Sequence, residues 1–474
     1  MDGAARGGGF EGAGGTRDVA GRRFAVLGLA RTGIGVARLL ARRGARVTGL
    51  DLKPRHQLPP GIEELERAGV RVILGPHPVE ELRGADCIVI SPGIPELPEV
   101  VEAERAGVRV VSEVEVGLWW LRAPVAAVTG TNGKSTVTTL IGEMARRGGR
   151  PVFAGANLGT PLADAVDGPA DAPEGLVVAE LSSFQLERTS SLHARVALLL
   201  NVTDDHLDRH GSLEAYAAVK GRVFLNQTPE DFAVVRAGDA LCERLAGGGR
   251  ARVLRFGAPG TEAFLDGEEL VVRAPGTDEL RLPRSRLRIR GAHNLDNALA
   301  ALLAARLLGT PPAAMAETLE AFTGLPHRMQ LVGEVRGVEF YDDSKATNVG
   351  AALRAIEGLD RPGVLIAGGR EKGGSYAPLR EAIRRKIVRI VLIGEARRAM
   401  RAELGDLVPC EEAETLEEAV RRAAAAAAPG QAVLLAPACS SWDMFRDYVE
   451  RGKRFAEAVR ELAREAGEEG DGGR

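Results

Sequence analysis

The chain alternates short apolar runs with amphipathic segments through most of its length. In its first quarter, β-branched and aliphatic residues gather in short runs, and between them lie segments such as "IGVARLLARRG", whose apolar positions have helical spacing. Strands of a parallel sheet alternate in this way with the helices that connect them. The pattern therefore predicts strands at 24–28, 45–51, 70–75, 86–93 and 108–113.

Two further sets of strand-like runs follow. The set nearest the C-terminus lies at 337–344, 363–369, 387–394 and 431–438, again with helical patterns between the runs. The second set lies at 124–130, 175–181 and 195–203, and a glycine-punctuated, strand-rich piece follows it from about residue 251 to residue 290. Because such a piece lacks intervening helices, we expect an antiparallel appendage on the second sheet.

These sets predict an α/β protein of three domains, and 474 residues are enough for each domain to bury its own core. The first and last domains are expected to be Rossmann-like, and the central one to be a P-loop ATPase-like α/β domain with the antiparallel appendage. Both ends of the chain have the glycine-rich or charged composition of disordered tails. The predicted divisions are a tail at 1–22, domains at 23–121, 122–325 and 326–465, and a tail at 466–474.

Composition narrows the classes of partner. The formal net charge of -3 gives no general attraction to nucleic acid or to an anionic membrane. No uncharged apolar run is long enough to span a bilayer, and the first twenty residues lack the apolar core of a secretion signal. The four cysteines show no C-x-x-C spacing. We therefore expect a cytoplasmic protein without nucleic acid or membrane partners. Small-molecule substrates and a monomeric state are expected as well.

Lysine is unusually rare in this chain. Only seven of the 62 basic residues are lysine, so a generic surface charge here is nearly always arginine. Lysine offers a compact ammonium and a nitrogen that can be deprotonated and modified, and arginine offers neither. Each lysine is therefore a candidate for a specific role, and the alternative is that coding bias left a few at random.

The stretch "AVTGTNGKSTVTTL", residues 127–140, resembles a nucleotide phosphate loop, although Val128 stands where the usual motif has glycine. An apolar strand precedes it, and a helix pattern follows it. In that setting, backbone N–H groups face phosphates, a lysine contacts the outer phosphates, and a hydroxyl reaches a metal ion. An ordinary capped turn is the alternative. The loop's candidate residues are Gly130, Thr131, Asn132, Gly133, Lys134, Ser135 and Thr136.

Two side chains near the ends of other predicted strands could complete a metal site. Glu180 ends the apolar run of "VVAELSSFQLE", and His206 closely follows another run in "LNVTDDHLDRHG". The carboxyl ends of parallel strands line one crevice, so both residues are expected near the phosphate loop. Magnesium prefers oxygen ligands, and a histidine would also permit manganese.

With "TGTNGKST", "ELSSFQLE" and "NVTDDHLDRH" in this order, the chain resembles the Mur ligase family of ATP-dependent amino-acid-adding enzymes. Further matching segments are "GLARTGIG", "SPGIP", "GAHNLDNALAA", "LPHRMQ", "DDSKATN", "AGGREKGGSY" and "LAPACSSWDMF". The resemblance implies that D-glutamate is joined to UDP-N-acetylmuramoyl-L-alanine through an acyl phosphate, in peptidoglycan precursor synthesis. A sibling ligase that adds another amino acid, or a folylpolyglutamate-type ligase, is the alternative.

The resemblance also implies roles for individual residues. ATP and magnesium, with two ions expected, would be held by the phosphate loop, with Ser135, Glu180, His206 and a carbamylated Lys220 as metal ligands. The implied catalytic residues are Lys134, Glu180, His206, Lys220 and Lys345. ATP would further contact Asn294, Asn297, Arg328 and Asp343, with His327 near the last domain's joining loop. D-glutamate would contact Lys345, Thr347, Lys372, Ser441 and Trp442. The UDP substrate would contact Arg31, Thr32, Asp51, Ser91, Gly93, Asn157 and Ser182.

The first domain also invites a dinucleotide interpretation. "GLARTGIG" gives a G-x-A-x-x-G spacing, and Asp51 follows at the distance of a ribose partner. The alanine weakens this signal, because a backbone must approach the pyrophosphate closely at that position. A nicotinamide-dependent dehydrogenase would leave the phosphate loop and the later lysines unexplained, and a motor NTPase would leave Glu180, Lys220 and Lys345 without roles.

Overall fold

The computed structural model describes residues 18–92, 94–95, 97–289, 291–371 and 375–471. Contacts divide the chain into two compact units. The first unit contains an N-terminal and a central sheet, and the second contains a C-terminal sheet together with Thr203–Asp205 and Leu287–Leu295. The two units are described separately below.

The N-terminal sheet is wholly parallel, with strand order β3-β2-β1-β4-β5. Its strands are β1 (Arg23–Leu27), β2 (Arg46–Asp51), β3 (Arg71–Leu74), β4 (Cys87–Ile90) and β5 (Arg109–Ser112). Four of them lie within a predicted run and β1 begins one residue before its run, so the alternating pattern identified this sheet correctly.

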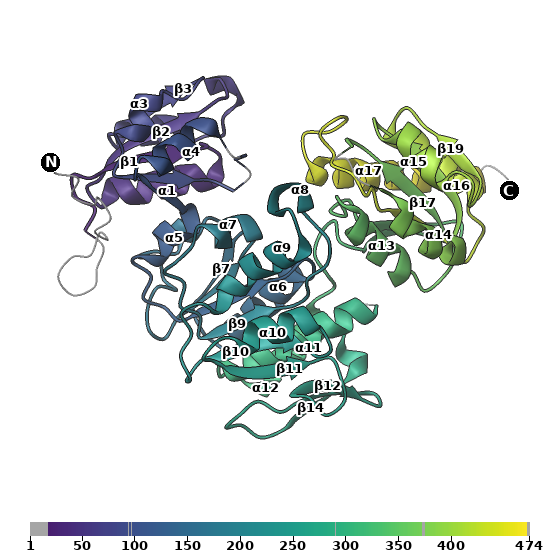
Figure 1. Ribbon diagram of the computed structural model, residues 1–474. Helices are drawn as coiled ribbons and strands as arrows, with labels where there is room; N and C mark the ends of the chain where they lie inside the picture. The colour runs from purple at the N-terminus through teal and green to yellow at the C-terminus, as the bar shows by residue number, and fades with distance from the viewer. Residues whose placement is uncertain (1–17, 93, 96, 290, 372–374, 472–474) are drawn as a thin grey trace. The chain divides into compact units, whose positions relative to one another are not determined.

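Helices cover both faces of the N-terminal sheet (Figure 1). They are α1 (Arg31–Arg42), α2 (Ile62–Arg67), α3 (Val79–Arg83), α4 (Pro98–Arg105) and α5 (Glu113–Leu118). Phe24 and Val26 of β1 pack in one core cluster with α1, α2 and α5, whereas Ala25 and Leu27 pack with α3 and α4. Successive residues of a strand point to opposite faces, so both faces of β1 are apolar and buried.

The central sheet has nine strands in the order β14-β13-β12-β11-β10-β9-β6-β8-β7. Its parallel part comprises β6 (Val125–Thr129), β7 (Val152–Ala156), β8 (Leu176–Glu180), β9 (Val196–Leu199), β10 (Phe232–Arg236) and β11 (Arg252–Phe256). The antiparallel appendage is β12 (Ala263–Asp266), β13 (Glu269–Val272) and β14 (Leu280–Pro283), as predicted. Strands β7 and β10 were not anticipated, and β11, which lies within the piece expected to be antiparallel, pairs parallel with β10.

The central helices are α6 (Lys134–Arg147), α7 (Ser183–Glu187), α8 (Leu207–His210), α9 (Leu213–Gly221), α10 (Ala240–Gly247), α11 (Ala292–Leu307) and α12 (Pro312–Ala321). Helix α6 follows the phosphate loop, and its predicted apolar face is fully buried at Val137, Leu140, Ile141 and Met144. Apolar residues three and four apart lie on one side of a helix, and burying that side against the sheet fixes the helix.

The C-terminal sheet has the order β15-β16-β20-β17-β18-β19, in which only the edge pair β15 and β16 is antiparallel. Its strands are β15 (Gln330–Val335), β16 (Val338–Asp342), β17 (Gly363–Gly368), β18 (Ile387–Ile393), β19 (Cys410–Glu412) and β20 (Ala432–Leu435). Its helices are α13 (Val349–Gly358), α14 (Arg380–Lys386), α15 (Arg397–Leu404), α16 (Leu416–Ala426) and α17 (Tyr448–Asp471).

The ends of the chain are more ordered than the sequence suggested. Val19 is buried in the N-terminal core, although it belongs to the predicted tail 1–22, of which residues 1–17 lie outside the described part. Helix α17 runs through Asp471 and so covers much of the predicted tail 466–474, because its sequence is rich in the helix formers Ala, Glu and Arg. Within the described residues, no helix is long and apolar enough to cross a membrane.

Candidate functional site

The loop between β6 and α6 has the conformation that a phosphate site needs. Residues 130–133 separate the two elements, and Gly133 caps the helix with a φ of 84°, which glycine adopts without strain. A Cβ at Gly133 would lie 2.3 Å from Asn297 Oδ1, so only glycine allows this close approach. Val128 lies in β6, as predicted. The loop is therefore a shortened form whose helix begins directly at Lys134.

Asn201 braces the phosphate loop from the segment after β9. Its backbone carbonyl accepts the Thr131 N–H at 2.9 Å, and its side chain accepts from Asn132 N at 3.0 Å and donates to Asn132 O at 3.1 Å. The shape of the loop is thus fixed by a neighbouring strand end. Asn201 was not predicted as a site residue, although the chain has only seven asparagines and their rarity was a usable signal.

Two of the rare lysines meet at the carbonyl of Gly130. Lys134 Nζ donates to the carbonyls of Gly130 and Thr131, both at 2.9 Å, and Lys220 Nζ donates to Gly130 O at 2.8 Å. Lys220 is only 1% exposed, and its Nζ lies 4.5 Å from the ring centroid of Tyr216. Burying an ammonium is costly without such partners. Lys220 is therefore not a generic surface charge.

Glu180 lies at the same edge of the sheet as the phosphate loop. It ends β8 in register with Val128 of β6 and with Ala156 of β7. Its side chain is 1% exposed, and Glu180 Oε1 accepts a hydrogen bond from Asn157 Nδ2 at 2.6 Å. The register thus brings Glu180 and Asn157 to the strand ends that hold the phosphate loop.

His206 and Ser135 are two other protein side chains expected to bind a metal ion at this edge of the sheet. His206 precedes α8 with a φ of 54°, and its ring lies 4.8 Å from Phe184 and 6.4 Å from Tyr216, centroid to centroid. Ser135, with a fully buried hydroxyl, opens α6. Among the described residues, no group of three or more His, Cys, Asp or Glu side chains has a metal-holding arrangement. A hard ion such as magnesium would therefore need donors besides Glu180 and His206, such as phosphate or carbamate oxygens.

Asn294 and Asn297 lie in the first turns of α11. A spacing of three puts them on the same side of the helix, and Asn297 lies against Gly133 of the phosphate loop. The sequence analysis expected both residues at the ATP site.

The second unit has its own cluster of candidate residues, around the loop that follows β16. His327 Nδ1 lies 2.7 Å from Asp342 Oδ2, and the His327 carbonyl accepts the Lys345 N–H at 3.2 Å. Lys345 Nζ lies 5.1 Å from the ring centroid of Tyr448, whose ring also contacts His327 edge-on. Asp343 Oδ1 accepts the Met329 N–H at 3.3 Å. The loop 342–345 is thus tied to the segment 327–329.

The electrostatics of Asp343 distinguish it from a surface carboxylate. Burial raises the pKa of its carboxyl to about 7, and the positive charge of Arg328 opposes that effect only in part. A carboxyl with this pKa exchanges protons near neutral pH. Arg328 and Asp343, both expected at ATP, therefore interact within the second unit.

The expected D-glutamate residues lie on two loops of the second unit. Thr347 follows Lys345 on the first loop, and Ser441 and Trp442 lie on the second, which follows β20. The loops are joined where Ala438 N donates to Ala346 O at 2.9 Å. Ser441 is buried, whereas Trp442 is 68% exposed. Lys372, expected in the same set, lies outside the described residues.

The first sheet positions the expected UDP-substrate residues at the ends of its strands. Asp51 Oδ2 accepts the Leu29 N–H at 2.7 Å, and its Oδ1 accepts the Lys53 N–H at 2.9 Å. Ser91 Oγ donates to the Gly28 carbonyl at 2.8 Å. Both side chains thus fix the backbone of the loops around them. Gly93 lies outside the described residues.

Arg31 and Thr32 open helix α1, beside these loops. Arg31 Nη1 donates to the carbonyl of Gly159 at 3.5 Å, in the segment that follows β7 of the central sheet. Helix α1 therefore begins near the segment that carries Asn157. Ser182 caps α7 and accepts the N–H of Gln185, so three expected UDP-substrate residues lie on elements of the central sheet or contact them.

Three family models match consecutive parts of the chain. They are "Mur ligase MurD-like, N-terminal domain" at residues 22–112, "Mur ligase middle domain" at 128–305 and "Mur ligase, glutamate ligase domain" at 327–439. The chain is 46% identical over 446 residues to a UDP-N-acetylmuramoylalanine--D-glutamate ligase of Trichlorobacter lovleyi, covering 93% of this chain and 99% of that one. The chain belongs to the Mur ligase family. A ligase of the same name from Geobacter metallireducens is 45% identical to this Mur ligase, covering 94% and 98% of the two chains.

Solved structures support the Mur ligase fold. The MurF ligase of Thermotoga maritima in complex with ADP superimposes with a TM-score of 0.59 at 16% identity, covering 94% of this chain and 96% of that one. A pseudomurein peptide ligase type C of Methanothermus fervidus gives a TM-score of 0.58 at 18% identity, with coverages of 93% and 100%. Enzymes of the Mur ligase family use ATP and Mg²⁺.

Arg451 of this Mur ligase was missed by sequence reasoning. It is fully buried on α17, where it donates to the Ser344 carbonyl at 2.8 Å, to the Ser344 hydroxyl at 3.0 Å and to the Cys439 carbonyl at 3.2 and 3.3 Å. It therefore ties together the two loops that carry Lys345 and Ser441. One arginine in an arginine-rich chain gives no signal of this kind.

Proposed function

We propose that this Mur ligase joins D-glutamate to UDP-N-acetylmuramoyl-L-alanine, with ATP as energy source, in the synthesis of peptidoglycan precursors. The observation that carries the proposal is identity of 42 to 46% over nearly the whole chain with ligases of that name. Structures at 16 to 18% identity support the fold alone. A sibling ligase for another amino acid is the second candidate.

The proposed reaction has two steps. A carboxylate oxygen of the acceptor attacks the γ-phosphorus of ATP, the bond to the β-phosphate breaks, and ADP leaves with its electron pair. The amine of D-glutamate then attacks the acyl carbon, a C–N bond forms, and the C–O bond to phosphate breaks while the amine loses a proton. Both steps depend on orientation and on neutralising negative charge.

We propose that the phosphate loop holds ATP. Its backbone N–H groups at the start of α6 point toward a bound anion, as helix termini do. Lys134 already contacts two loop carbonyls, and its ammonium is suited to the outer phosphates. The proposed ATP contacts are residues 130–136, Asn294, Asn297, Arg328 and Asp343, with His327 beside them.

We propose that Ser135, Glu180, His206 and a carbamylated Lys220 hold two Mg²⁺ ions, for which Mn²⁺ could substitute. The ions would neutralise charge on the phosphates as it moves during transfer. Carbamylation adds CO₂ to the neutral amine of Lys220 and releases a proton, which turns a buried cation into a carboxylate donor. The shortage of carboxylates at this edge and the complete burial of Lys220 support this assignment.

The two small-molecule substrates are proposed to bind on different elements. The UDP-substrate contacts are Arg31, Thr32, Asp51, Ser91, Gly93, Asn157 and Ser182. The D-glutamate contacts are Lys345, Thr347, Lys372, Ser441 and Trp442. Lys345 is also proposed to act in catalysis, with Lys134, Glu180, His206 and Lys220.

The organisation of the chain completes the proposal. We place the domain limits at 23–121 for the UDP substrate, 122–325 for ATP and 326–465 for the amino acid. We further propose that the enzyme acts as a cytoplasmic monomer with neither nucleic acid nor membrane as partner.

The test is phosphate release by the protein mixed with UDP-N-acetylmuramoyl-L-alanine, ATP, Mg²⁺ and one amino acid at a time. We expect release with D-glutamate and none above background with L-glutamate, L-alanine or L-lysine. Absence of any D-glutamate-dependent release would refute the proposal. Release with L-lysine instead would favour a sibling ligase.

The role of Lys220 needs its own test. We expect Lys220→Ala to lose most activity and to regain part of it in formate or acetate, which can occupy the place of the carbamate oxygens. Lys453→Ala, on the exposed surface of α17, is the control and should stay fully active. Labelled bicarbonate should give the parent, but not Lys220→Ala, a carbamate signal by NMR. Full activity of Lys220→Ala without added carboxylate contradicts the assignment.

A further inference from the structure

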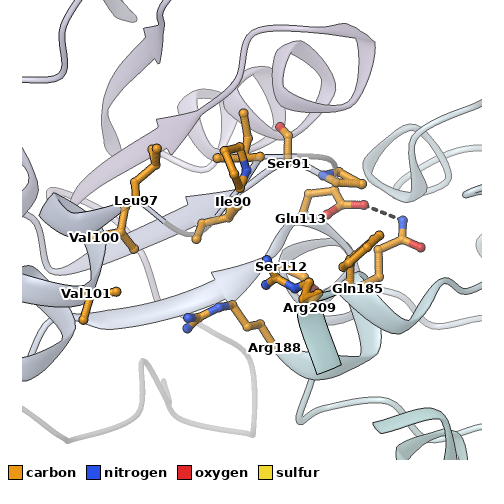
Figure 2. Close-up of a pocket in the computed structure, with 14 residues that line it drawn as sticks. Ile90, Ser91, Leu97, Val100, Val101, Ser112, Glu113, Gln185, Arg188 and Arg209 are labelled. Carbon is orange, nitrogen blue, oxygen red and sulfur yellow. Dashed lines mark hydrogen bonds between the residues drawn. The ribbon is translucent and has the colours of Figure 1, made fainter. Parts of the chain in front are cut away.

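A pocket lies between elements of the N-terminal and central sheets within the first unit. It is partly open to solvent and is lined by the segment after β4, by α4, by the start of α5, and by residues of α7 and α8. Ser91, which is proposed for the UDP substrate, is among the lining residues. Figure 2 shows Glu113 and Gln185 side by side among the residues that line this pocket, joined by a hydrogen bond.

Glu113 is a buried carboxyl group, and one of its two oxygens accepts a hydrogen bond from a protein side chain. It is 2% exposed, and Glu113 Oε1 accepts a hydrogen bond from Gln185 Nε2 at 2.7 Å. Glu113 Oε2 is buried in the pocket wall without a hydrogen-bond partner among the described residues. A buried acceptor left unpaired is costly, and native proteins usually satisfy such groups with protein, water or ligand.

The contact with Gln185 extends to the loop that carries Ser182. Gln185 Oε1 accepts from both the Ser182 N–H at 2.9 Å and the Ser182 hydroxyl at 3.0 Å, while Ser182 Oγ accepts the Gln185 N–H at 3.3 Å. Because the carbonyl end of the amide is used by Ser182, its NH₂ end must face Glu113. Glu113 therefore sets the orientation of Gln185, and Gln185 fixes the loop directly after Glu180.

The pocket lining contains both positively charged and carboxyl side chains. The pocket lining includes Arg188 and Arg209, whose guanidinium groups pair with Glu104 and Glu187 on the outer side. Among the described lining residues, Glu113 is the one that carries a carboxyl group. A ligand that carries both phosphates and hydrogen-bond donors matches this set.

We propose that Glu113 is a binding and positioning residue for the acceptor substrate. Its Oε1 holds the Gln185 amide, and its Oε2 accepts a hydrogen bond from a hydroxyl or amide N–H on the sugar portion of the sugar nucleotide. This inference rests on the proposed function, because it takes the pocket to be part of the acceptor site.

Two substitutions separate the two tasks of Glu113. In Glu113→Gln, the new amide oxygen can still accept from Gln185, but a donor replaces the acceptor toward the ligand. We expect KM for the acceptor to rise about tenfold or more, with kcat and KM for ATP within about twofold of the parent. In Glu113→Ala both contacts are lost, so kcat should also fall about fivefold or more. Glu102→Gln, an exposed carboxylate on α4 paired with Arg83, is the control and should match the parent.

Direct binding keeps the test independent of turnover. The dissociation constants of UDP and of UDP-N-acetylmuramoyl-L-alanine are measured by calorimetry for the parent and for all three variants. We expect the preference for the sugar nucleotide over UDP to fall about tenfold in both Glu113 variants, with UDP affinity unchanged. An unchanged preference overturns the proposal, and so does an equal loss of UDP affinity, which would indicate a general structural role. If the parent binds but does not turn over the acceptor, the proposed function fails while this ratio still decides the role of Glu113.

Discussion

Arg451 offers the sharpest test of how the C-terminal unit builds its site. Its guanidinium spans two loops, with hydrogen bonds to the carbonyls of Ser344 and Cys439 and to the Ser344 hydroxyl. Burial lowers the pKa of Arg451 to about 10, so the charged form is maintained in the folded protein at a cost. We consider the replacements Arg451→Met and Arg451→Lys.

The expected stability change is a difference of two opposing terms. Removing the guanidinium leaves two buried carbonyls without this donor, at about 1 to 3 kcal/mol each. Removing the charge also relieves a desolvation cost of about 3 kcal/mol, from the lowering of the pKa from 12.5 to about 10. The free energy of unfolding of Arg451→Met should therefore lie between a gain of about 1 kcal/mol and a loss of about 3 kcal/mol. Arg451→Lys should lose more than the Met variant, because it retains a buried charge while a single ammonium cannot bridge both loops.

Stability is read from hydrogen exchange of backbone amides in β16 and β17, because these strands report opening of the C-terminal sheet alone. The loops should separate in both variants, so KM for D-glutamate should rise about tenfold or more while KM for the acceptor stays within about twofold. Arg454→Met is the control. Arg454 lies on the exposed side of α17, the helix that also carries Arg451, and it pairs there with Glu417 of α16. Two results would refute this estimate of opposing stability terms. One is a loss of unfolding free energy above 5 kcal/mol in Arg451→Met, and the other is an Arg451→Lys variant as stable as the parent. An unchanged KM for D-glutamate would refute the loop coupling.

Three further changes test other parts of the structure. Gly133→Ala should abolish ATP binding measured by calorimetry, because its Cβ would meet Asn297 Oδ1 at 2.3 Å and φ is positive; an affinity within twofold of the parent contradicts the loop geometry. Gly452→Ala should lower kcat about tenfold or more, because its Cβ would lie 2.1 Å from His327 Nδ1; unchanged kcat means that this contact is not needed. Burial raises the pKa of Glu113 to about 7 from 4.5, with the Gln185 amide and backbone N–H groups opposing it. The folded protein therefore binds this proton more tightly than the unfolded chain, and stability is lost as pH rises from about 4.5 to 7. Relative to the parent, Glu113→Gln should gain about 2 to 3 kcal/mol between pH 5 and pH 8, and a difference that does not vary with pH would refute the shift.

Strands β1, β6, β17 and β20 were predictable because they are buried on both faces and read as continuous apolar runs, although β10 was missed with a similarly buried run. β7 was missed since "VFAGA" combines a short length with glycine and alanine, which weaken a strand signal. β15 was missed because it is a half-exposed edge strand with an irregular register at Leu331 and Gly333. An edge strand forms because it pairs with the neighbouring strand, and the local sequence pattern does not reveal that pairing.

Some residues of the candidate site were likewise predictable from the sequence, and others were not. The phosphate loop, Glu180 and Lys220 were predictable because strand ends and rare lysines mark them in the sequence, and the register of β6 with β8 then brings them together. Which contacts hold them could not be predicted. Asn201 and Arg451 act on backbone carbonyls and N–H groups, and a backbone group looks the same at every position in a sequence.

Gly452, like Asn201 and Arg451, affects the candidate site by positioning other residues. Its missing side chain lets His327 Nδ1 reach Asp342 Oδ2 at 2.7 Å, and Asp342 Oδ1 in turn accepts the Ser344 N–H at 2.8 Å. Arg451, the adjacent residue on α17, holds the other side of Ser344 through its carbonyl and hydroxyl. One turn of a helix far along the sequence thus fixes both His327 and the loop that presents Lys345. The proposed amino-acid site therefore depends on the docking of α17 as much as on the motifs proposed to contact the substrate.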